Sequence, residues 1–428
     1  MMRSKQNLLL SAQCLEAASV QPSRPNQTLA ANHLAAAGAD KLFRSIITQR
    51  PSWQDSAREY GFNFHTMHGE AYWDESAFYQ FNLQQIEQDI EAPTKELHQM
   101  CLSVVDKVVS DQQWLEKFQI PSEHWQFIKD SWLNKEPSLY SRMDLVYGGS
   151  GHAKLYENNA DTPTSLYETG FWQWLWLEDQ VNAGKLSRQS DQFNSLQEKL
   201  INRFATLKLS HFGETLYFCC CKDTDEDRGT VQYLEDCASA AGINCAFIYV
   251  EDIGLSADNC FTDLEHQKIT WMFKLYPWEF MLREEYASAL STSGTTWIEP
   301  PWKSILSNKA LLPMLWKMYP NHPNLLASFF EDELHLSNLQ NYVKKPIFAR
   351  EGANISIHID GVETYASPGP YGQEGYIYQA YHPLPAFGDN FTLIGSWLVN
   401  DQPAGISVRE DTNKITQDLS RFLPHIIL

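Results

Sequence analysis

The stretch SRMDLVYGGSGHAKLYENNADTPTS, residues 141–165, predicts a β-hairpin. Polar and apolar residues alternate in its first part, three glycines between residues 148 and 151 supply a turn, and the alternation then resumes. Side chains two residues apart on a strand share a face. Four polar side chains are therefore expected on one face of the hairpin: Arg142, Asp144, Glu157 and Asn159.

These four side chains suggest a site for a metal ion and phosphates. Two carboxylates and an amide oxygen suit Mg²⁺, which keeps several waters and takes further ligands from substrate phosphates. Arg142 would contact the same phosphates. The alternative is a solvated hairpin with an ordinary surface ion pair. The polar run at residues 157–164 favours a site, because it is longer than a strand needs in order to end.

Composition limits the possible partners. A chain of 428 residues is long enough for two or three domains. Its formal net charge of −20 argues against nucleic acid or an anionic membrane as the main partner, whereas a cationic substrate such as a polyamine would be attracted. No segment reaches the ~18 to 20 apolar residues of a spanning helix, and the apolar run at residues 8–10 is too short for a signal peptide. We therefore expect a cytoplasmic protein.

The eight cysteines lack the paired spacing of a zinc site and predict inert thiols. Four regions are expected along the chain. They are a loose N-terminal extension (1–48), a helical region (49–135), a region with the hairpin and an α/β unit (136–300), and a nucleotide-binding region (301–428).

Within the third region, two features point toward the hairpin site. A helix that begins after Thr164 or Ser165 would direct its N-terminus at the proposed phosphates. Residues 215–250 predict a strand, a helix and a strand of a parallel sheet. Glu226 and Asp227 belong to an acidic loop at the carboxyl end of the first strand, where open α/β sheets bind ligands. This loop is either a site for a cationic amine or a solvated turn.

The last region predicts nucleotide contacts. Residues 344–355 suggest a strand, a glycine turn and a returning strand, in which a lysine contacts phosphates and Gly352 lets the backbone approach them. Lys309 is a second candidate cation, and Gln379 on the predicted strand 376–381 would face an adenine edge. Arg409 would supply a second guanidinium. Each charge alone is also compatible with a solvated surface, and no P-loop motif is present.

Together these motifs resemble the synthetase domain of glutathionylspermidine synthase, and more closely its short bacterial relatives, the acid–amine ligases. The resemblance covers about residues 47–428. It implies an α/β (α+β) chain with an ATP-grasp fold and a preceding α/β domain. It also implies a ligase that uses Mg²⁺ and ATP to activate a carboxylic acid as an acyl phosphate, which a small-molecule amine then attacks.

Residue by residue, the resemblance implies the following roles. The Mg²⁺ ligands are Asp144, Glu157 and Asn159. The catalytic arginines are Arg142 on the transferred phosphate and Arg409. The nucleotide-binding positions are Arg142, Met143, Asp144, Lys309, Lys345, Gly352, Gln379, Lys414, Ile415 and Thr416. The acid substrate meets Thr162 and Thr164, and the amine meets Glu226 and Asp227. The doubled lysine leaves Lys344 as an alternative to Lys345.

Two other classes of protein are compatible with parts of this set. A regulatory module that binds ATP without turnover would be expected to lack a metal or phosphate ligand. A metal hydrolase could use Asp144 and Glu157 but would not need Lys309, Lys345 and Arg409 on a nucleotide. The acid, the amine and the oligomeric state do not follow from the sequence.

Overall fold

The computed structural model describes residues 41–416 and 420–428. Most of the predicted loose extension, residues 1–40, lies outside the described residues. The residues that follow form strand β1 (Phe43–Ile46). Within the described ranges, none of the helices combines the length and the apolar character needed to cross a membrane.

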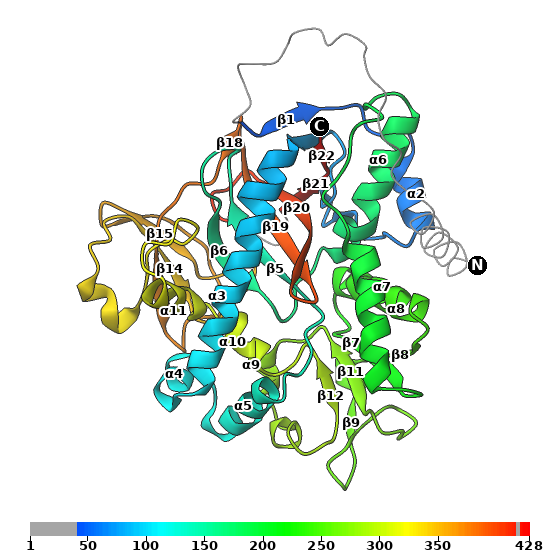
Figure 1. Cartoon of the computed structure of the whole chain (residues 1–428), viewed down its shortest axis with the longest axis vertical. Coiled ribbons are helices and arrows are strands. Elements are labelled where there is room, and N and C mark those ends of the chain that lie inside the picture. The colour runs from blue at the N-terminus through cyan, green and yellow to red at the C-terminus, as the bar shows by residue number, and fades with distance from the viewer. Residues whose placement is uncertain (1–40, 417–419) are drawn as a thin grey trace.

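The predicted hairpin is the edge of a central six-stranded sheet (Figure 1). Strands β5 (Tyr140–Val146) and β6 (Lys154–Asn159) are antiparallel, with Arg142 opposite Asn159 and Asp144 opposite Glu157. The shared face predicted from the alternation is therefore confirmed. The remaining strands are β18 (Ala386–Phe387), β19 (Asn390–Val399), β20 (Gln402–Asp411) and β21 (Arg421–Leu423).

The predicted α/β unit is a four-stranded parallel sheet, in the order β12-β11-β7-β8. Its strands are β7 (Thr215–Cys220), β8 (Asn244–Tyr249), β11 (Trp271–Lys274) and β12 (Thr296–Ile298). Helix α8 (Asp225–Ala240) connects β7 to β8 and packs against α7 (Leu196–Leu207). The prediction of a strand, a helix and a parallel strand is confirmed.

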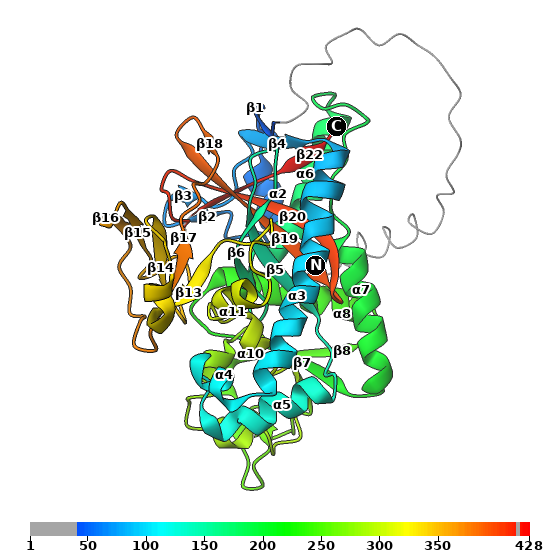
Figure 2. The same cartoon turned by 60° about the vertical axis from the view of Figure 1, so that its left-hand side comes forward.

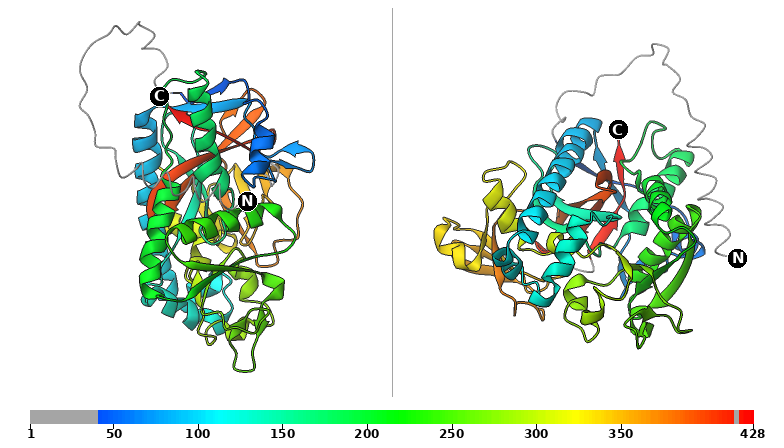
Figure 3. Two further views of the ribbon diagram at one scale, coloured as in Figure 1. Left: turned by 90° about the vertical axis from the view of Figure 1, so that its right-hand side faces the viewer. Right: turned by 60° about the horizontal axis from the view of Figure 1, so that its bottom comes forward.

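A five-stranded antiparallel sheet follows, in the order β13-β17-β14-β15-β16 (Figure 2). It consists of β13 (Ser328–Phe330), β14 (Tyr342–Pro346), β15 (Ser356–Ile359), β16 (Val362–Ala366) and β17 (Tyr376–Ala380). Helices α10 (Lys303–Leu306) and α11 (Leu311–Met318) precede it. This sheet and the parallel sheet lie on opposite sides of the central strands (Figure 3, right).

The N-terminal region is mostly helical, as predicted, with α2 (Trp53–Glu59), α3 (Ala92–Val109), α4 (Gln112–Lys117) and α5 (Trp125–Leu133). The apolar face of α3 is buried, and α3 runs across the central sheet (Figure 1). Strands β2 (Thr66–Met67), β3 (Glu70–Ala71) and β4 (Ala77–Phe81) were not predicted. The side chains of β4 are nearly all buried, so its sequence AFYQF shows no alternation.

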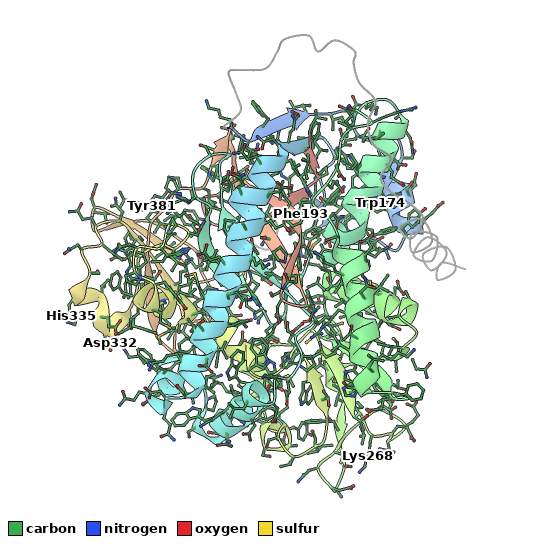
Figure 4. All side chains as sticks on the ribbon, viewed as in Figure 1. Trp174, Phe193, Lys268, Asp332, His335 and Tyr381 are labelled. Carbon is green, nitrogen blue, oxygen red and sulfur yellow. The ribbon has the colours of Figure 1, made fainter. Side chains whose placement is uncertain are left out.

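The helix predicted after the hairpin is present as a π-helical turn (Glu168–Trp172) that continues into α6 (Gln173–Asn182). Trp172 and Trp176 are buried in the core, whereas Trp174 on α6 is half-buried (Figure 4). Ser165 has a φ of +68°, and its hydroxyl accepts a bond from Arg142 at 3.4 Å. The start of this helix is therefore tied to the hairpin by that arginine.

Smaller elements complete the described chain. They are β9 (Gly254–Leu255), β10 (Phe261–Thr262), α9 (Trp278–Met281) and β22 (His425–Ile427). Strand β22 pairs in parallel with β4, and β4 pairs with β1. This three-stranded sheet thus combines strands from both ends of the described chain. The region boundaries at residues 48, 135 and 300 stay predictions.

Candidate active site

A cavity of about 780 Å³ lies where the three main sheets meet. One wall is the polar face of the β5–β6 hairpin. A second wall comes from β14 and the loops of the five-stranded sheet, and a third from the carboxyl edge of the parallel sheet. The cavity is large enough for a nucleotide and a second substrate.

The hairpin wall holds the predicted metal ligands. The Asn159 amide nitrogen lies 3.2 Å from Asp144 Oδ2 and 3.3 Å from Glu157 Oε1, so the three side chains converge on one point. Burial raises the pKa of Asp144, although Arg142 opposes this effect. Burial also acts to raise the pKa of Glu157, but Lys309 and Lys345 outweigh it and hold that pKa well below its usual range.

This cluster fits a hard divalent cation. Its donors are carboxylate and amide oxygens, which Mg²⁺ prefers. Rotation of the Asn159 amide about its terminal bond would turn its oxygen, in place of its nitrogen, toward the two carboxylates. In this structure the guanidinium of Arg142 pairs with Asp144 and the ammonium of Lys309 pairs with Glu157, while the amide nitrogen of Asn159 donates to both carboxylates. The residues present therefore fit a bound Mg²⁺.

Arg142 is buried beside the cluster. Its Nε and Nη2 donate to the two oxygens of Asp144 at 2.7 and 3.2 Å, a bidentate pair. Its Nη1 donates to the carbonyl of Thr164 at 3.1 Å. Arg142 thus links the predicted metal ligands to the loop that carries Thr162 and Thr164, both of which line the cavity.

Two lysines complete the cationic side of the cavity. Lys309 Nζ lies 2.8 Å from Glu157 Oε2 and donates to the carbonyl of Ala349 at 2.9 Å. Lys345 is buried, and its desolvation lowers its pKa to about 8 even though Glu157 acts to raise it. Lys344 does not line the cavity, and its Nζ lies 4.0 Å from the ring centroid of Tyr376.

The structure does not place two of the predicted nucleotide contacts on the cavity wall. Gln379 is buried behind Lys345, where its Oε1 accepts from Lys345 Nζ at 2.7 Å and its Nε2 donates to the carbonyl of Leu155 at 3.2 Å. Both polar atoms of this side chain thus have protein partners, and its adenine contact stays a prediction. Met143 points to the opposite face of β5 and belongs to the hydrophobic core.

The remaining predicted nucleotide residues do line the cavity. Arg409 on β20 stacks over Phe422, with 5.2 Å between its guanidinium carbon and the ring centroid. Gly352 has a φ of +71°, and a Cβ there would lie 2.7 Å from the carbonyl oxygen of Thr416. This close approach brings the loop after β14 against the segment of Lys414, Ile415 and Thr416.

The parallel sheet supplies an acidic wall. Tyr72 donates its hydroxyl to Glu226 Oε1 at 2.6 Å. Burial and the neighbouring Glu226 raise the pKa of Asp227 to about 7, although a hydrogen bond from Thr224 opposes this. Both carboxylates face the same cavity as the metal cluster, so the structure brings together the two predicted substrate ends and the predicted metal ligands.

The sequence analysis missed an arginine in the cavity. Arg350 donates to Thr162 Oγ1 at 2.9 Å, and its Nε and Nη2 both lie about 3 Å from Glu279 Oε1. The signal available in the sequence was that Arg350 lies in the same predicted strand–turn–strand segment, residues 344–355, as Lys345. Glu279 follows β11 closely along the chain, at the same sheet edge as the acidic loop, and offered a second signal.

The N-terminal region also contributes to the wall, although no local sequence pattern predicts this contribution. Phe64, Met67, His68 and Tyr72 line the cavity next to helix α8. A Cβ at Gly229 on α8 would lie 2.2 Å from the Phe64 ring, so this glycine allows the two elements to touch. The contact joins residues far apart in the sequence, and no local pattern encodes it.

A second group of possible metal ligands lies near the acidic wall. Among the described residues, Cys221, Asp223 and Glu251 place their ligand atoms within 4.8 Å of one another. Both carboxylates are exposed, and burial raises the pKa of the Cys221 thiol to about 11. We assign this group no role.

Comparisons with known proteins assign this chain to a family. A family model described as glutathionylspermidine synthase pre-ATP-grasp matches residues 44–428. A protein of Haemophilus influenzae named "Putative acid–amine ligase" is 40% identical over 388 residues, which cover 88% of this chain and 97% of that protein.

Two longer proteins are also similar. Trypanothione synthetase of Crithidia fasciculata is 27% identical over 349 residues, which cover 75% of this chain and 52% of that protein. The bifunctional glutathionylspermidine synthetase/amidase of Escherichia coli is 28% identical over 372 residues, which cover 80% of this chain and 58% of that protein. This chain therefore spans little more than half the length of either protein.

These matches confirm the resemblance stated from the motifs, together with the ATP-grasp fold class that it implied. The family match begins near the predicted start at residue 47 and continues to the last residue. The chain belongs to the glutathionylspermidine synthase family of ATP-grasp ligases, which form amide bonds.

Proposed function

We propose that this chain uses ATP and Mg²⁺ to join a carboxylic acid of the peptide class to an amine, through an acyl phosphate. Glutathione is the first candidate acid and a polyamine the first candidate amine. One observation carries the proposal: a single cavity holds an oxygen-ligand cluster, two lysines with two arginines, and an acidic wall. Phosphoryl transfer needs positioning and charge neutralisation, which the first two groups supply.

The cationic side chains would hold the triphosphate. Arg142 and Arg409 would contact the transferred phosphate, while Lys309 and Lys345 would neutralise the neighbouring ones. Asp144, Glu157 and Asn159 would hold Mg²⁺, which when bound offsets further phosphate charge. The acid's carboxylate oxygen attacks the terminal phosphorus, and ADP leaves. No nucleophilic side chain is required for this step.

The two substrate ends differ in charge. Arg350 and the hydroxyls of Thr162 and Thr164 suit a peptide-like acid, because a guanidinium and hydroxyl groups bind carboxylates and amides. Glu226 and Asp227 suit an ammonium group. The relatives named for glutathionylspermidine and trypanothione synthesis support this pairing of substrates, and the net charge of −20 favours a cationic one. We expect the reaction to occur in the cytoplasm.

The test is amine-dependent release of ADP and phosphate from Mg-ATP. Glutathione and other peptide acids are screened against a panel of polyamines, and the products are identified by mass spectrometry. Asp144→Asn removes one carboxylate of the cluster and should abolish the new amide. Asp360→Asn removes an exposed carboxylate at a turn outside the cavity wall and should leave the rate unchanged, because Asn tolerates the φ of +50° found there.

The outcomes separate the alternatives. A new amide mass that disappears in Asp144→Asn supports the ligase and identifies its substrates. Nucleotide binding without turnover for every pair would contradict the proposal and favour a regulatory module. Cleavage of a peptide acid or an amide without ATP would favour a metal hydrolase.

A further inference from the structure

Forming an amide from an amine requires a proton acceptor. A primary amine enters as an ammonium ion at neutral pH, and an ammonium nitrogen has no lone pair with which to attack. One proton must leave before the carbon–nitrogen bond forms, and a second must leave as the amide is completed. The acceptor is expected on the acidic wall, because the proposed function places the amine there.

The two adjacent carboxylates of that wall have different surroundings. Glu226 accepts a 2.6 Å hydrogen bond from Tyr72, a buried phenol that stabilises the charged form of the carboxylate. Behind it, Glu168 is fully buried, and burial together with the charge of Glu226 raises the pKa of Glu168 to about 8. Glu226 is therefore a hydrogen-bonded carboxylate on the cavity wall and is suited to bind an ammonium group.

Asp227 differs from its neighbour. It is the third residue of α8, where the helix dipole favours the charged form. Burial and Glu226 nevertheless raise its pKa to about 7, which is the range in which a carboxylate both accepts and releases a proton. Pairs of carboxylates with separated pKa values commonly divide binding from proton transfer.

Asp227 lines the same cavity as Glu226, Arg350 and the predicted metal ligands. Its charge interacts with Arg350 and Glu351 from the loop after β14, and with Tyr140 at the start of the strand that carries Arg142. The other titratable groups that interact with it are Glu226, Cys220 and Cys221. A base at this place faces the same cavity as Glu226, which is the proposed site of the amine.

We propose that Asp227 is the catalytic base that takes the first proton from the ammonium group, while Glu226 binds the amine. This inference rests on the proposed ligase function. The freed nitrogen lone pair attacks the acyl carbon, the carbon–oxygen bond to phosphate breaks, and phosphate leaves with the bonding electrons. The second proton goes to the departing phosphate, and Asp227 returns its own proton to water.

The test compares two nucleophiles in the full-length protein with Mg-ATP and glutathione. Spermidine is mostly protonated at neutral pH and needs a base, whereas hydroxylamine is mostly uncharged and traps an acyl phosphate without one. Asp227→Asn should lower kcat with spermidine about 100-fold or more, with little change in its KM, and should leave hydroxamate formation intact. Asp227→Glu should restore part of the rate.

The pH profile gives a second readout. The wild-type rate with spermidine should fall as pH falls through about 7, because a protonated Asp227 cannot accept a proton. In Asp227→Asn the rate should instead rise about tenfold per pH unit, because it follows the fraction of free amine. Glu226→Gln should raise the KM for spermidine and keep the fall in rate at low pH, but move its midpoint to lower pH, because the charge of Glu226 helps to raise the pKa of Asp227.

Three results would overturn the inference. In Asp227→Asn, a raised KM with unchanged kcat would make Asp227 a binding residue only. Equal loss of hydroxamate formation would make it necessary for acid activation or folding. A variant pH profile that matches wild type would exclude it as the base. If the wild-type protein forms no hydroxamate with any peptide acid of the screen, the proposed function itself fails.

Discussion

Lys309 Nζ lies 2.8 Å from Glu157 Oε2 across the cavity, so a lysine that precedes α11 neutralises a carboxylate on the β5–β6 hairpin. Both groups are mostly removed from solvent, and the pair therefore links the two walls between which a nucleotide would bind.

Breaking this pair should separate stability from nucleotide binding. Lys309→Met removes the cationic partner of the Glu157 carboxylate and should reduce the free energy of unfolding by about 1 to 3 kcal/mol. The double variant Lys309→Met/Glu157→Gln should recover stability without recovering ATP affinity. Urea unfolding and calorimetric ATP titration measure the two quantities. Recovery of ATP binding in the double variant would remove Lys309 from the nucleotide site.

Lys345 should give the protein two opposite responses to alkaline pH. Its folded-state pKa of about 8 lies below the value of ~10.4 in an unfolded chain, so the unfolded state binds more protons between these values. The contribution of this lysine to folding stability should therefore increase from pH 8 to 10. ATP affinity should decrease over the same range, because the ammonium group loses its charge.

Lys345→Met should abolish both trends, as measured by chemical unfolding and ATP titration at several pH values. The neighbouring Lys344→Met serves as the matched control, since Lys344 lies over Tyr376 outside the cavity wall. An equal effect of Lys344→Met would show that the register of the lysine pair in solution differs from this structure.

Gly352→Ala should weaken ATP binding more than it weakens folding. The positive φ alone costs about 1 kcal/mol for alanine, and the added Cβ would also meet the carbonyl of Thr416 at 2.7 Å. Gly361→Ala is the control, because Gly361 has a φ of +79° and open space around it. Thermal unfolding should shift in both variants, and more in Gly352→Ala because of the added contact, whereas the KM for ATP should rise only in Gly352→Ala.

Arg350→Lys should raise the KM for the acid substrate by about tenfold and change the KM for ATP little. A lysine keeps the charge but cannot contact Thr162 and Glu279 with the fork of a guanidinium. Thr162→Val removes only the hydroxyl partner and should give a smaller effect. Steady-state kinetics with each substrate varied in turn measure both constants. A change confined to the KM for ATP would place Arg350 in the nucleotide site.

The sequence predicted those parts of the site that local patterns encode. The alternation on both sides of the glycines predicted the register of Asp144 with Glu157, and the strand–helix–strand pattern predicted the acidic loop at the sheet edge. The hairpin pattern also brought Gly352 and Lys345 to the cavity. Each of these features depends on residues that are close in sequence.

The differences between the expected and the observed placement have another origin. Gln379 is on an inner strand whose three middle side chains are buried, so alternation did not reveal which face points to the cavity. Met143 lies between two site residues on a strand, and its side chain necessarily points to the other face. The contribution of Phe64 and Tyr72 depends on long-range packing against α8, which no local pattern encodes.

The pairing of Leu145 on β5 with Ile394 on β19 has a consequence for biosynthesis. A ribosome delivers all three predicted metal ligands early, but their strand finds its inner neighbour only when the last part of the chain emerges. Until then the edge of β5 is unprotected and open to wrong partners. Folding of this enzyme should therefore be slow and dependent on chaperones that shield a nascent β-edge, and a translation product that stops before residue 390 should contain the ligands without a formed site.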